Sequence, residues 1–567
     1  MNETFGNKLR KGAARGNTGA QAPPPAPSLQ DWLTLFVPLA LFAGMAVLFG
    51  MRYTTNDDAT IANIAAGAYG ADRIHLIYVN IVIGILLRPL YALAGGFNWY
   101  MLMQLALSLI SCAVLLRLAM ERLGTARGLC VFLGTALVLS PLVFYSVQYV
   151  KTSGLCCAAG LLLMADTWHK PCRRTALGLF LAWISSLLRW DMFCAAGGLS
   201  AALFLTRFFV LDKPQKRRAA GTMALLLLLA FATKGVDMLS YRMDEGWRAY
   251  TEYNAARTEF SDFKALHMPE GNPFTDDGVS DTDLGMLLSW NYYDGRVFPA
   301  GRVEQLAEKL PGPPLVQIAK DTLCTGAEMV YGEWYRAALA LTVLAGLALL
   351  KWNRKSLAFW GVGALLGLEI LYLTMRGRFP HYVETALQLC TVPMFLAALM
   401  QGDWRRKLSL RLCGIYFGVL ALCSLISFYS LWGESRYYRE TRIEADASAL
   451  YAMSADKEHL YLIPTSYIDA AAGYDVWHPR PEGFFSNIIA YGGWLSHAPL
   501  QEETLADYGL ASSPLLDAVD NDGVFVGADD IASVAQYATE HSGRLVEAVA
   551  VGENPLAPYQ LRTADSG

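Results

Sequence analysis

The sequence predicts a polytopic α-helical membrane protein that ends in a small α/β domain. Three observations support this fold class. Hydrophobic residues make up 54% of the 567 residues and charged residues only 17%, whereas soluble domains carry about 25% charged residues. The apolar residues come in blocks of about 20, the helical length that crosses a bilayer core about 30 Å thick. The chain after residue 433 is instead polar and acidic.

The apolar blocks give eleven candidate membrane spans within residues 32–433. Three of them, residues 32–51, 128–150 and 412–433, contain no charged side chain. The others are shorter apolar cores near residues 99–119, 153–168, 176–190, 192–211, 221–240, 334–350, 356–375 and 383–401. Because several of these cores are short, their ends must include polar positions or snorkelling Arg and Lys side chains.

The stretch Leu76–Ala94 is apolar but is interrupted by Asn80, Arg88 and Pro89. If it does not span, the remaining loops sort by charge, with twenty basic residues on one side of the membrane and four in the short loops of the other. Such a bias marks the cytoplasmic side. We therefore expect residues 76–94 to form an interfacial helix on the outer face. The N-terminus is then cytoplasmic and the C-terminus extracytoplasmic.

Three polar segments flank or interrupt this domain of residues 32–433. Residues 1–31 predict a disordered basic cytoplasmic tail, because prolines separate its basic residues from the first span and no signal-peptide cleavage site follows. Residues 241–333 predict an outer loop, with a helix at Trp247–Phe263. Residues 434–567 carry 21 acidic and 7 basic side chains, which suits an extracytoplasmic domain, since the inner leaflet is anionic.

The extracytoplasmic segment also has the pattern of a small α/β domain. Its expected elements are strands at His459–Ile463, Val524–Val526 and Leu545–Val551, with a helix at Asp529–Thr539. The ten Cys residues lie mostly in or beside apolar segments and predict small buried hydrophobes rather than disulfides. His and Cys spacing predicts no metal site. We expect no cofactor and no nucleic-acid partner.

The most distinctive polar motif follows the first span. Residues 52–58 read RYTTNDD and place two adjacent carboxylates, Asp57 and Asp58, just outside the membrane. Burial and mutual repulsion there raise a carboxylate pKa and make it usable as a general base. Alternatively, both carboxylates are solvated and serve only as the N-terminal cap of a helix over Ala59–Ala68.

With this motif the chain resembles the GT-C glycosyltransferases, such as the protein mannosyltransferases, the aminoarabinose transferases and the O-antigen glucosyltransferase-like families. In these families the first outer loop begins with an Asp-containing motif, and a short helix with a His-Pro-Pro-like element then lies along the outer face. Asn56, Asp57 and Asp58 correspond to the acidic motif, and His75 in IHLIY lies where the horizontal helix begins. No Pro follows His75. The resemblance covers roughly residues 30–430.

The resemblance implies an integral-membrane glycosyltransferase that moves a sugar from a polyprenyl-phosphate donor to an extracytoplasmic envelope glycan, glycolipid or protein. Asp57 or Asp58 takes the proton of the acceptor hydroxyl, and attack at the anomeric carbon expels the lipid phosphate with inversion. Asn56 and His75 are expected to contact the substrates. The leaving phosphate needs positive charge, for which the candidates are Lys151, Arg189, Arg376, Arg378 and His381.

Other roles remain open for several of these residues. Arg189 can pair with Asp191, and the other basic residues can simply anchor helix ends at the membrane interface. Arg257 and Asp262, in the outer loop, face either the active cavity or solvent. Glu369 lies inside an apolar run and either pairs with a neighbouring helix or has a functional role.

Two other functions are compatible with the same pattern. A multi-pass transporter or lipid-linked sugar flippase explains the spans and Glu369, but its charges should cluster at the bilayer midplane. A non-catalytic scaffold that displays the acidic domain predicts that Asp57 and Asp58 tolerate Asn.

Overall fold

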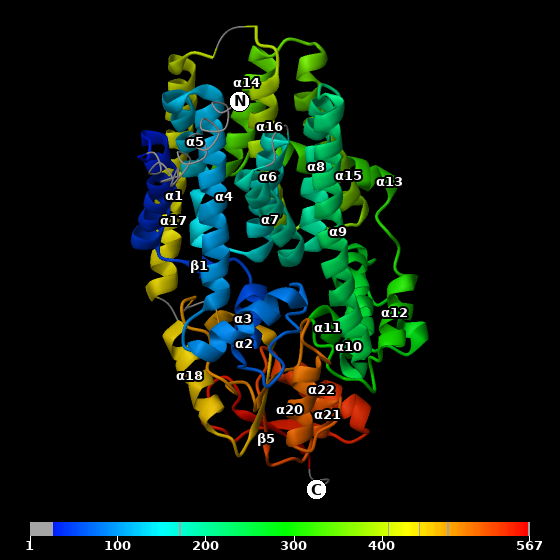
Figure 1. Ribbon diagram of the computed structural model, residues 1–567. Coiled ribbons are helices and arrows are strands. Elements are labelled where there is room, and N and C mark those ends of the chain that lie inside the picture. The colour runs from blue at the N-terminus through cyan, green and yellow to red at the C-terminus, as the bar shows by residue number, and fades with distance from the viewer. Residues whose placement is uncertain (1–25, 169–171, 406–407, 441–442, 473–475, 565–567) are drawn as a thin grey trace, which may run out of the picture.

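The computed structural model describes residues 26–168, 172–405, 408–440, 443–472 and 476–564. In Figure 1 the long helices lie together in the upper part, and the C-terminal segment lies at the lower end. The long helices are α1 Leu29–Phe49, α4 Trp99–Leu123, α5 Thr125–Ser140, α6 Tyr149–Thr167, α7 Arg173–Leu188, α8 Trp190–Phe208, α9 Lys213–Met243, α14 Ala337–Leu349, α15 Leu357–Met375, α16 His381–Gln401 and α17 Leu410–Glu440.

Each expected apolar core falls mainly on one of these helices, but the core expected at 128–150 leaves α5 after Ser140 and continues through a π turn and a short strand to the start of α6. Among the described residues, seven helical segments are long and apolar enough to cross a membrane by length and composition, and they contain α1, α4, α5, α9, α15, α16 and α17. Helix α14 belongs to a shorter apolar segment. Helices α6, α7 and α8 are not both long enough and apolar enough to be counted as candidate spans. The protein is therefore a polytopic helical membrane protein, and eleven spans stays a prediction.

Helix α6 is buried along almost its entire length. Small residues explain how its neighbours approach it. A Cβ atom added at Gly160 would lie 2.6 Å from the Gly178 carbonyl oxygen of α7, and one added at Gly154 would lie 2.8 Å from the Ala386 carbonyl oxygen of α16. Close backbone approach through small residues is a common way of packing membrane helices. It fixes the position of Tyr149, the first residue of α6.

The loop after α1 is tied to the segment that precedes α6. Strand β1, Arg52–Tyr53, pairs in parallel with β2, Ser146–Val147. The N–H of Thr54 then donates a hydrogen bond to the Val147 carbonyl oxygen at 3.0 Å. A π-helical turn, η1 Pro141–Tyr145, links α5 to β2. These contacts hold the start of α2, Asn56–Ala66, beside the start of α6.

The expected interfacial helix is α3, Ile81–Leu93, and the expectation that it begins near His75 is wrong. Asn80 is its N-cap, where the side-chain oxygen accepts a hydrogen bond from the Val82 N–H at 3.0 Å. An Asn cap fixes the first turn because it satisfies an otherwise unpaired N–H. Thirteen residues rise only about 20 Å, too little to cross the bilayer core.

The outer loop contains four α-helices, of which the first confirms the helix expected near Trp247. They are α10 Glu245–Arg257, α11 Asp281–Leu288, α12 Ala300–Lys309 and α13 Leu315–Glu328. The π turn η2, Thr258–Lys264, and the 3₁₀ turns η3 Ala265–His267 and η4 Thr275–Asp277 connect α10 to α11. Two further 3₁₀ turns, η5 Trp334–Arg336 and η6 Arg354–Ser356, precede α14 and α15.

The C-terminal segment contains a five-stranded sheet in the order β4-β3-β5-β7-β6. Strands β4, β3 and β5 are parallel, and β7 and β6 are antiparallel additions. The strands are β3 Leu460–Ile463, β4 Ile488–Ala490, β5 Val524–Val526, β6 Val546–Ala550 and β7 Tyr559–Thr563. The helices are α18 Ile443–Ala455, α19 Thr465–Ala472, α20 Pro499–Asp507, α21 Pro514–Asp517 and α22 Ile531–Ser542.

The outer loop and the C-terminal sheet share one hydrophobic core. It joins Phe260 and Tyr292 of the loop to Leu462 and Val524 of the sheet. The same C-terminal segment also contacts the loop after α2, where the Phe485 N–H donates to the Ala68 carbonyl oxygen at 2.8 Å. Two segments that are far apart in the sequence therefore form one body at the lower end of the molecule in Figure 1.

Candidate active site

A cavity of about 1510 Å³ lies between the membrane helices and the C-terminal sheet. Asn56 lines it from the start of α2, and other walls come from the starts of α6 and α8 and the end of α15. The C-terminal wall follows the parallel strands: Thr465 comes after β3, Gly492 after β4 and Asp529 after β5. Open α/β sheets bind ligands outside the carboxyl ends of their strands. The sheet thus turns its usual binding edge toward the cavity.

Asp57, in the first turn of α2, lines this cavity. Burial raises its pKa from 3.8 to about 6, and Asp262 adds to the rise. Arg189 and a hydrogen bond from the Trp494 side chain act in the opposite direction. A carboxylate with this pKa is largely ionised at pH 7 and still accepts a proton readily. The geometry and the electrostatics both suit a general base.

Asp58 is fully buried and does not line the cavity. Its Oδ1 accepts hydrogen bonds from the Tyr100 hydroxyl at 3.0 Å, the Gln104 amide at 2.9 Å and the Tyr149 backbone N–H at 3.1 Å. Burial raises its pKa to about 7. Asp58 therefore joins α2 to α4 and α6. The reading of both carboxylates as solvated caps is wrong, because Thr55 occupies the N-cap position.

Arg189, between α7 and α8, lines the cavity. It forms an ion pair with Asp191, with nitrogen and oxygen 3.0 Å apart. Its guanidinium also lies over the Tyr78 ring, 5.6 Å from the centroid. The ion pair that the sequence offers as an alternative is thus found, and the expected contact of Arg189 with phosphate stays a prediction. A cation held in this way keeps its charge at the cavity wall.

Arg376 and Arg378, which follow α15, also line the cavity. Arg376 pairs with Glu259 at 3.2 Å, and Arg378 pairs with Asp262 at 2.6 Å. Both partners belong to η2 of the outer loop. The ion pairs therefore link the end of a membrane helix to the outer loop at the cavity edge.

Arg257, near the end of α10, is a further cavity cation. Only 1% of its surface is exposed, so the solvent-facing alternative is wrong. Its guanidinium lies over the Trp290 ring and donates to Asn254 and Thr258. One nitrogen, Nη1, is buried without a hydrogen-bond partner among the described residues. Such a nitrogen is suited to receive an oxyanion.

His75 does not line the cavity. Its Nδ1 lies 2.6 Å from Asp72 Oδ2, and its Nε2 lies 2.9 Å from the Ser240 hydroxyl of α9. The ring also packs against Tyr241 and Trp247. These contacts connect the segment before α3 to α9 and α10. The expected contact of His75 with substrate stays a prediction.

Lys151 and His381 also lie outside the cavity lining. The Lys151 ammonium is buried and donates to both the carbonyl oxygen and the hydroxyl of Ser146. His381 is largely exposed at the start of α16, with its ring nitrogen 3.6 Å from Glu384. Their expected roles in phosphate binding remain predictions.

Further cavity residues come from several separate elements. Tyr149 and Tyr382 come from the starts of α6 and α16, and Trp494 comes from the loop after β4. Trp494 also packs against Tyr78, with ring centroids 4.9 Å apart. Glu369 of α15 lines the membrane-facing part, and its Oε2 has no hydrogen-bond partner among the described residues. Only the fold brings these side chains together.

One group of possible metal ligands lies outside the cavity lining. It consists of Asp283, Glu540 and His541. His541 Nε2 lies 2.6 Å from Asp283 Oδ1, and Glu540 accepts hydrogen bonds from Ser280 and Thr282. These three side chains thus already satisfy one another and their neighbours, which accounts for the cluster without an ion.

A scan of protein-family models and a search of curated proteins match nothing to this chain. Among solved structures, the chain is similar to the crystal structure of ArnT from Cupriavidus metallidurans bound to undecaprenyl phosphate. The TM-score is 0.41 and the identity 13%, over 95% of this chain and 99% of that one. The apo state gives a TM-score of 0.39 and 13% identity, over 94% and 97%. Over nearly its full length, the chain thus has a distant structural similarity to ArnT.

Proposed function

We propose that this chain is an integral-membrane glycosyltransferase that moves a sugar from a polyprenyl-phosphate donor to an acceptor outside the cytoplasm. The observation that carries the proposal is the composition of one cavity. A partly buried carboxylate of raised pKa, Asp57, lines it together with four arginines. Membrane helices form one side of the cavity, and the carboxyl ends of a parallel sheet form another.

The donor's lipid chain is expected to enter between membrane helices. Ala195 of α8, Leu373 of α15 and Leu387 of α16 supply apolar wall there. A polyprenyl chain packs favourably against such a wall, and its phosphate is then expected to lie beside the arginines. Arg257, with its unpartnered nitrogen, and Arg189 are the cations that we assign to the phosphate. Positive charge stabilises the phosphate as it leaves.

The acceptor is expected to approach from the sheet side. Thr465, Ser466 and Ser533 line that side and offer hydroxyl groups. Trp494 offers an indole ring beside Asp57. Sugars and hydroxyl-bearing side chains are bound by this combination of hydrogen bonds and aromatic faces. In the proposed topology this side is extracytoplasmic, because the opposite loops carry the excess of basic residues.

The reaction then needs a single displacement. The Asp57 carboxylate takes the proton of the acceptor hydroxyl while the hydroxyl oxygen bonds to the anomeric carbon. The bond from that carbon to the phosphate oxygen breaks, and its electron pair leaves with the polyprenyl phosphate. Attack opposite the leaving group inverts the anomeric centre. Asp58 acts as a positioning residue, since its hydrogen bonds orient the first turn of α2.

The test compares envelope glycans in cells that carry the wild-type gene, a deletion, Asp57→Asn or Asp276→Asn. Asp276 is an exposed aspartate of the outer loop that does not line the cavity, so it serves as the matched control. Loss of the general base should slow transfer about 10²–10⁴-fold. We expect one sugar to disappear in the deletion and in Asp57→Asn at equal membrane levels, and to remain in Asp276→Asn.

The same experiment separates the transferase from a lipid-linked sugar flippase. Glu369 of α15, whose buried Oε2 has no hydrogen-bond partner among the described residues, is the observation that favours a flippase. A flippase needs no general base at Asp57. If the deletion removes the sugar while Asp57→Asn restores it, the transferase proposal fails and the flippase is the better account.

A further inference from the structure

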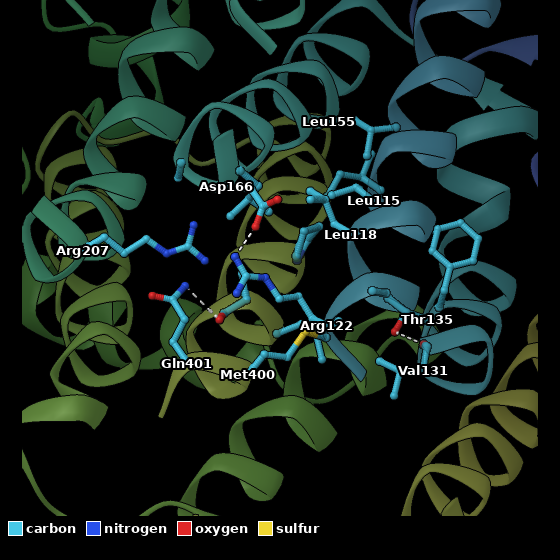
Figure 2. Close-up of a pocket in the computed structure, with 18 of the residues that line it drawn as sticks. Leu115, Leu118, Arg122, Val131, Thr135, Leu155, Asp166, Arg207, Met400 and Gln401 are labelled. Atoms are coloured by element: carbon cyan, nitrogen blue, oxygen red, sulfur yellow. Dashed lines mark hydrogen bonds and ion pairs between the residues drawn. The ribbon is translucent and has the colours of Figure 1, made fainter. Parts of the chain in front are cut away.

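A second cavity, of about 1240 Å³, lies at the other end of the same helices. Asp191 at the start of α8 lines the first cavity, whereas Arg207 near its end lines the second. The 16 helical steps from Asp191 to Arg207 rise about 24 Å. Helices α4, α5, α6 and α16 complete the walls, which Figure 2 shows at close range. This cavity is not part of the proposed active site.

The walls of the second cavity are mostly apolar. They include Leu115 and Leu118 of α4, Leu139 of α5 and Leu155 of α6. Its lining also contains three exposed apolar side chains, Phe209, Val210 and Leu357, with exposed fractions of 73%, 85% and 54%. In a membrane protein such side chains contact lipid. The cavity is therefore continuous with an apolar surface.

One end of the cavity is cationic. Arg122, Arg207, Arg354 and Lys355 line it, and among the described residues of the lining Asp166 is the only acidic one. Arg122 pairs with Asp166, as Figure 2 shows. This pair leaves three cations without an acidic partner in the lining.

Arg207 is the most informative of these cations. Figure 2 shows its guanidinium reaching toward Asp166 and Arg122 with no interaction drawn to either. Its Nη1 is buried and has no hydrogen-bond partner among the described residues. A buried, unpaired charge in a membrane protein is costly and usually has a partner or a task. An anion that fits an apolar cavity would satisfy this nitrogen.

We propose that this cavity binds an anionic membrane phospholipid, with the headgroup phosphate on Arg207 and the acyl chains along the leucine-lined wall. A free phosphate leaves the apolar wall unfilled, whereas an amphiphile satisfies both the wall and the cations. The distribution of basic loops predicts that this end faces the cytoplasmic leaflet, which is rich in anionic lipid. The site is independent of sugar transfer.

Trp168 lines this cavity and provides a fluorescent reporter. The purified full-length protein in detergent micelles is titrated with phosphatidylglycerol that carries bromine on its acyl chains, because bromine quenches nearby tryptophan. The Trp168→Phe variant gives the quenching of the other thirteen tryptophans, which is subtracted. Phosphatidylcholine brominated in the same way reports any preference for charge.

We expect saturable quenching of Trp168 by the anionic lipid and about tenfold weaker binding of the zwitterionic one. Arg207→Ala should weaken anionic binding about tenfold, the loss typical of one charge-assisted hydrogen bond, and Arg207→Lys should restore part of it. The double change Arg354→Ala and Lys355→Ala alters exposed side chains and should also weaken binding. Arg217→Ala, an exposed arginine of α9 outside the lining, is the control.

Three results overturn the proposal. Equal quenching by the two lipids shows a non-specific apolar surface. Unchanged binding in both Arg207→Ala and the double variant, each unfolding at the wild-type temperature, shows that the cations do not hold the headgroup. Competition by millimolar inorganic phosphate as effective as that by unbrominated phosphatidylglycerol identifies a free phosphate site. None of these readouts depends on turnover, so the result is separate from the test of the transferase.

Discussion

Neighbouring residues of a helix point about 100° apart, and this separates the environments of Asp57 and Asp58. Asp57 meets the cavity, where Arg189 and Trp494 act on it. Asp58 meets Tyr100 in the protein interior, where its Oδ1 is fully used in hydrogen bonds. One carboxylate is thus free for chemistry while the other holds the helix in place.

The pKa of Asp57 predicts the acid limb of the pH profile. A general base works only when ionised, so kcat/KM should fall about tenfold per pH unit below pH 6 and level off above pH 7. Because the folded-state pKa lies above the usual 3.8, ionisation of Asp57 disfavours the fold as pH rises from 4 to 6. Protonation of Asp57 therefore does not itself unfold the protein at low pH.

The measurement is transfer of sugar by purified protein from pH 4.5 to pH 8, with Asp276→Asn as a control that should keep the wild-type profile. Activity that stays level down to pH 4.5 rules out Asp57 as the base with this pKa.

Asp58 should respond to the shape of its replacement more than to the loss of charge. Asp58→Ala leaves the donors of Tyr100, Gln104 and Tyr149 without an acceptor and should cost about 3 kcal/mol of stability. Asp58→Asn keeps the accepting oxygen and should retain most of both stability and activity. Thermal unfolding in detergent and transfer rates measure this. A loss of transfer in Asp58→Asn as deep as in Asp57→Asn, at normal stability, assigns the base to Asp58.

The sequence predicts a site at the two adjacent carboxylates, but it does not predict that one lines the cavity while the other is buried. Their position after the first span and their adjacency are visible in residues 52–58. The donors that bury Asp58 come from α4 and α6, some 40 to 90 residues away. No local pattern encodes such contacts. For the same reason His75 has no sequence signal for its contact with Ser240 of α9.

At the scale of elements, α6 supports the site through its small residues. Tyr149 at its start donates its N–H to Asp58, and Arg189 follows the end of α7, the helix that contacts α6 at Gly160. The closeness of α6 and α7 thus sets the separation of two cavity walls. Apolar periodicity predicts helices of this kind. It does not predict which face of α6 meets α7, because the middle of α6, residues 154–164, has no polar side chain on any face.

A bulky side chain at Gly160 should separate these helices. In Gly160→Leu the added Cβ would lie 2.6 Å from backbone atoms of α7. We therefore expect the free energy of unfolding to fall by about 2 kcal/mol. Gly197→Leu on α8 is the matched control, since nothing lies within 4 Å of a Cβ there. Thermal unfolding in detergent is the readout, with transfer rate measured alongside. Equal stability of the two variants contradicts the close approach of α6 and α7.

At the scale of the whole molecule, three segments distant in sequence close one cavity. The membrane helices supply Arg189, the outer loop supplies Arg257, and the C-terminal segment supplies Trp494. Composition and charge predict the membrane part and the acidic C-terminal segment, because each has its own strong pattern. The docking between them is set by the shared core around Phe260 and Val524. The residues that form this core are common apolar types with no distinctive pattern, so the sequence alone does not predict the docking.

This docking places a side chain of the C-terminal segment on the proposed base. The Trp494 side chain donates a hydrogen bond that lowers the pKa of Asp57, against the larger effect of burial. Trp494→Phe removes the donor and keeps an aromatic ring. The pKa of Asp57 should then rise further, by about half a unit to one unit, the equivalent of one ordinary hydrogen bond. The acid limb of kcat/KM should move to higher pH by the same amount.

Trp477→Phe is the matched control, because Trp477 also belongs to the C-terminal segment but does not line the cavity. Its acid limb should coincide with that of wild type. A lower plateau in Trp494→Phe with an unmoved acid limb assigns Trp494 to acceptor binding alone. A shift in Trp494→Phe but not in Trp477→Phe means that the C-terminal segment tunes the base as well as enclosing the cavity. Removing that segment should then change the chemistry of transfer and not merely the choice of acceptor.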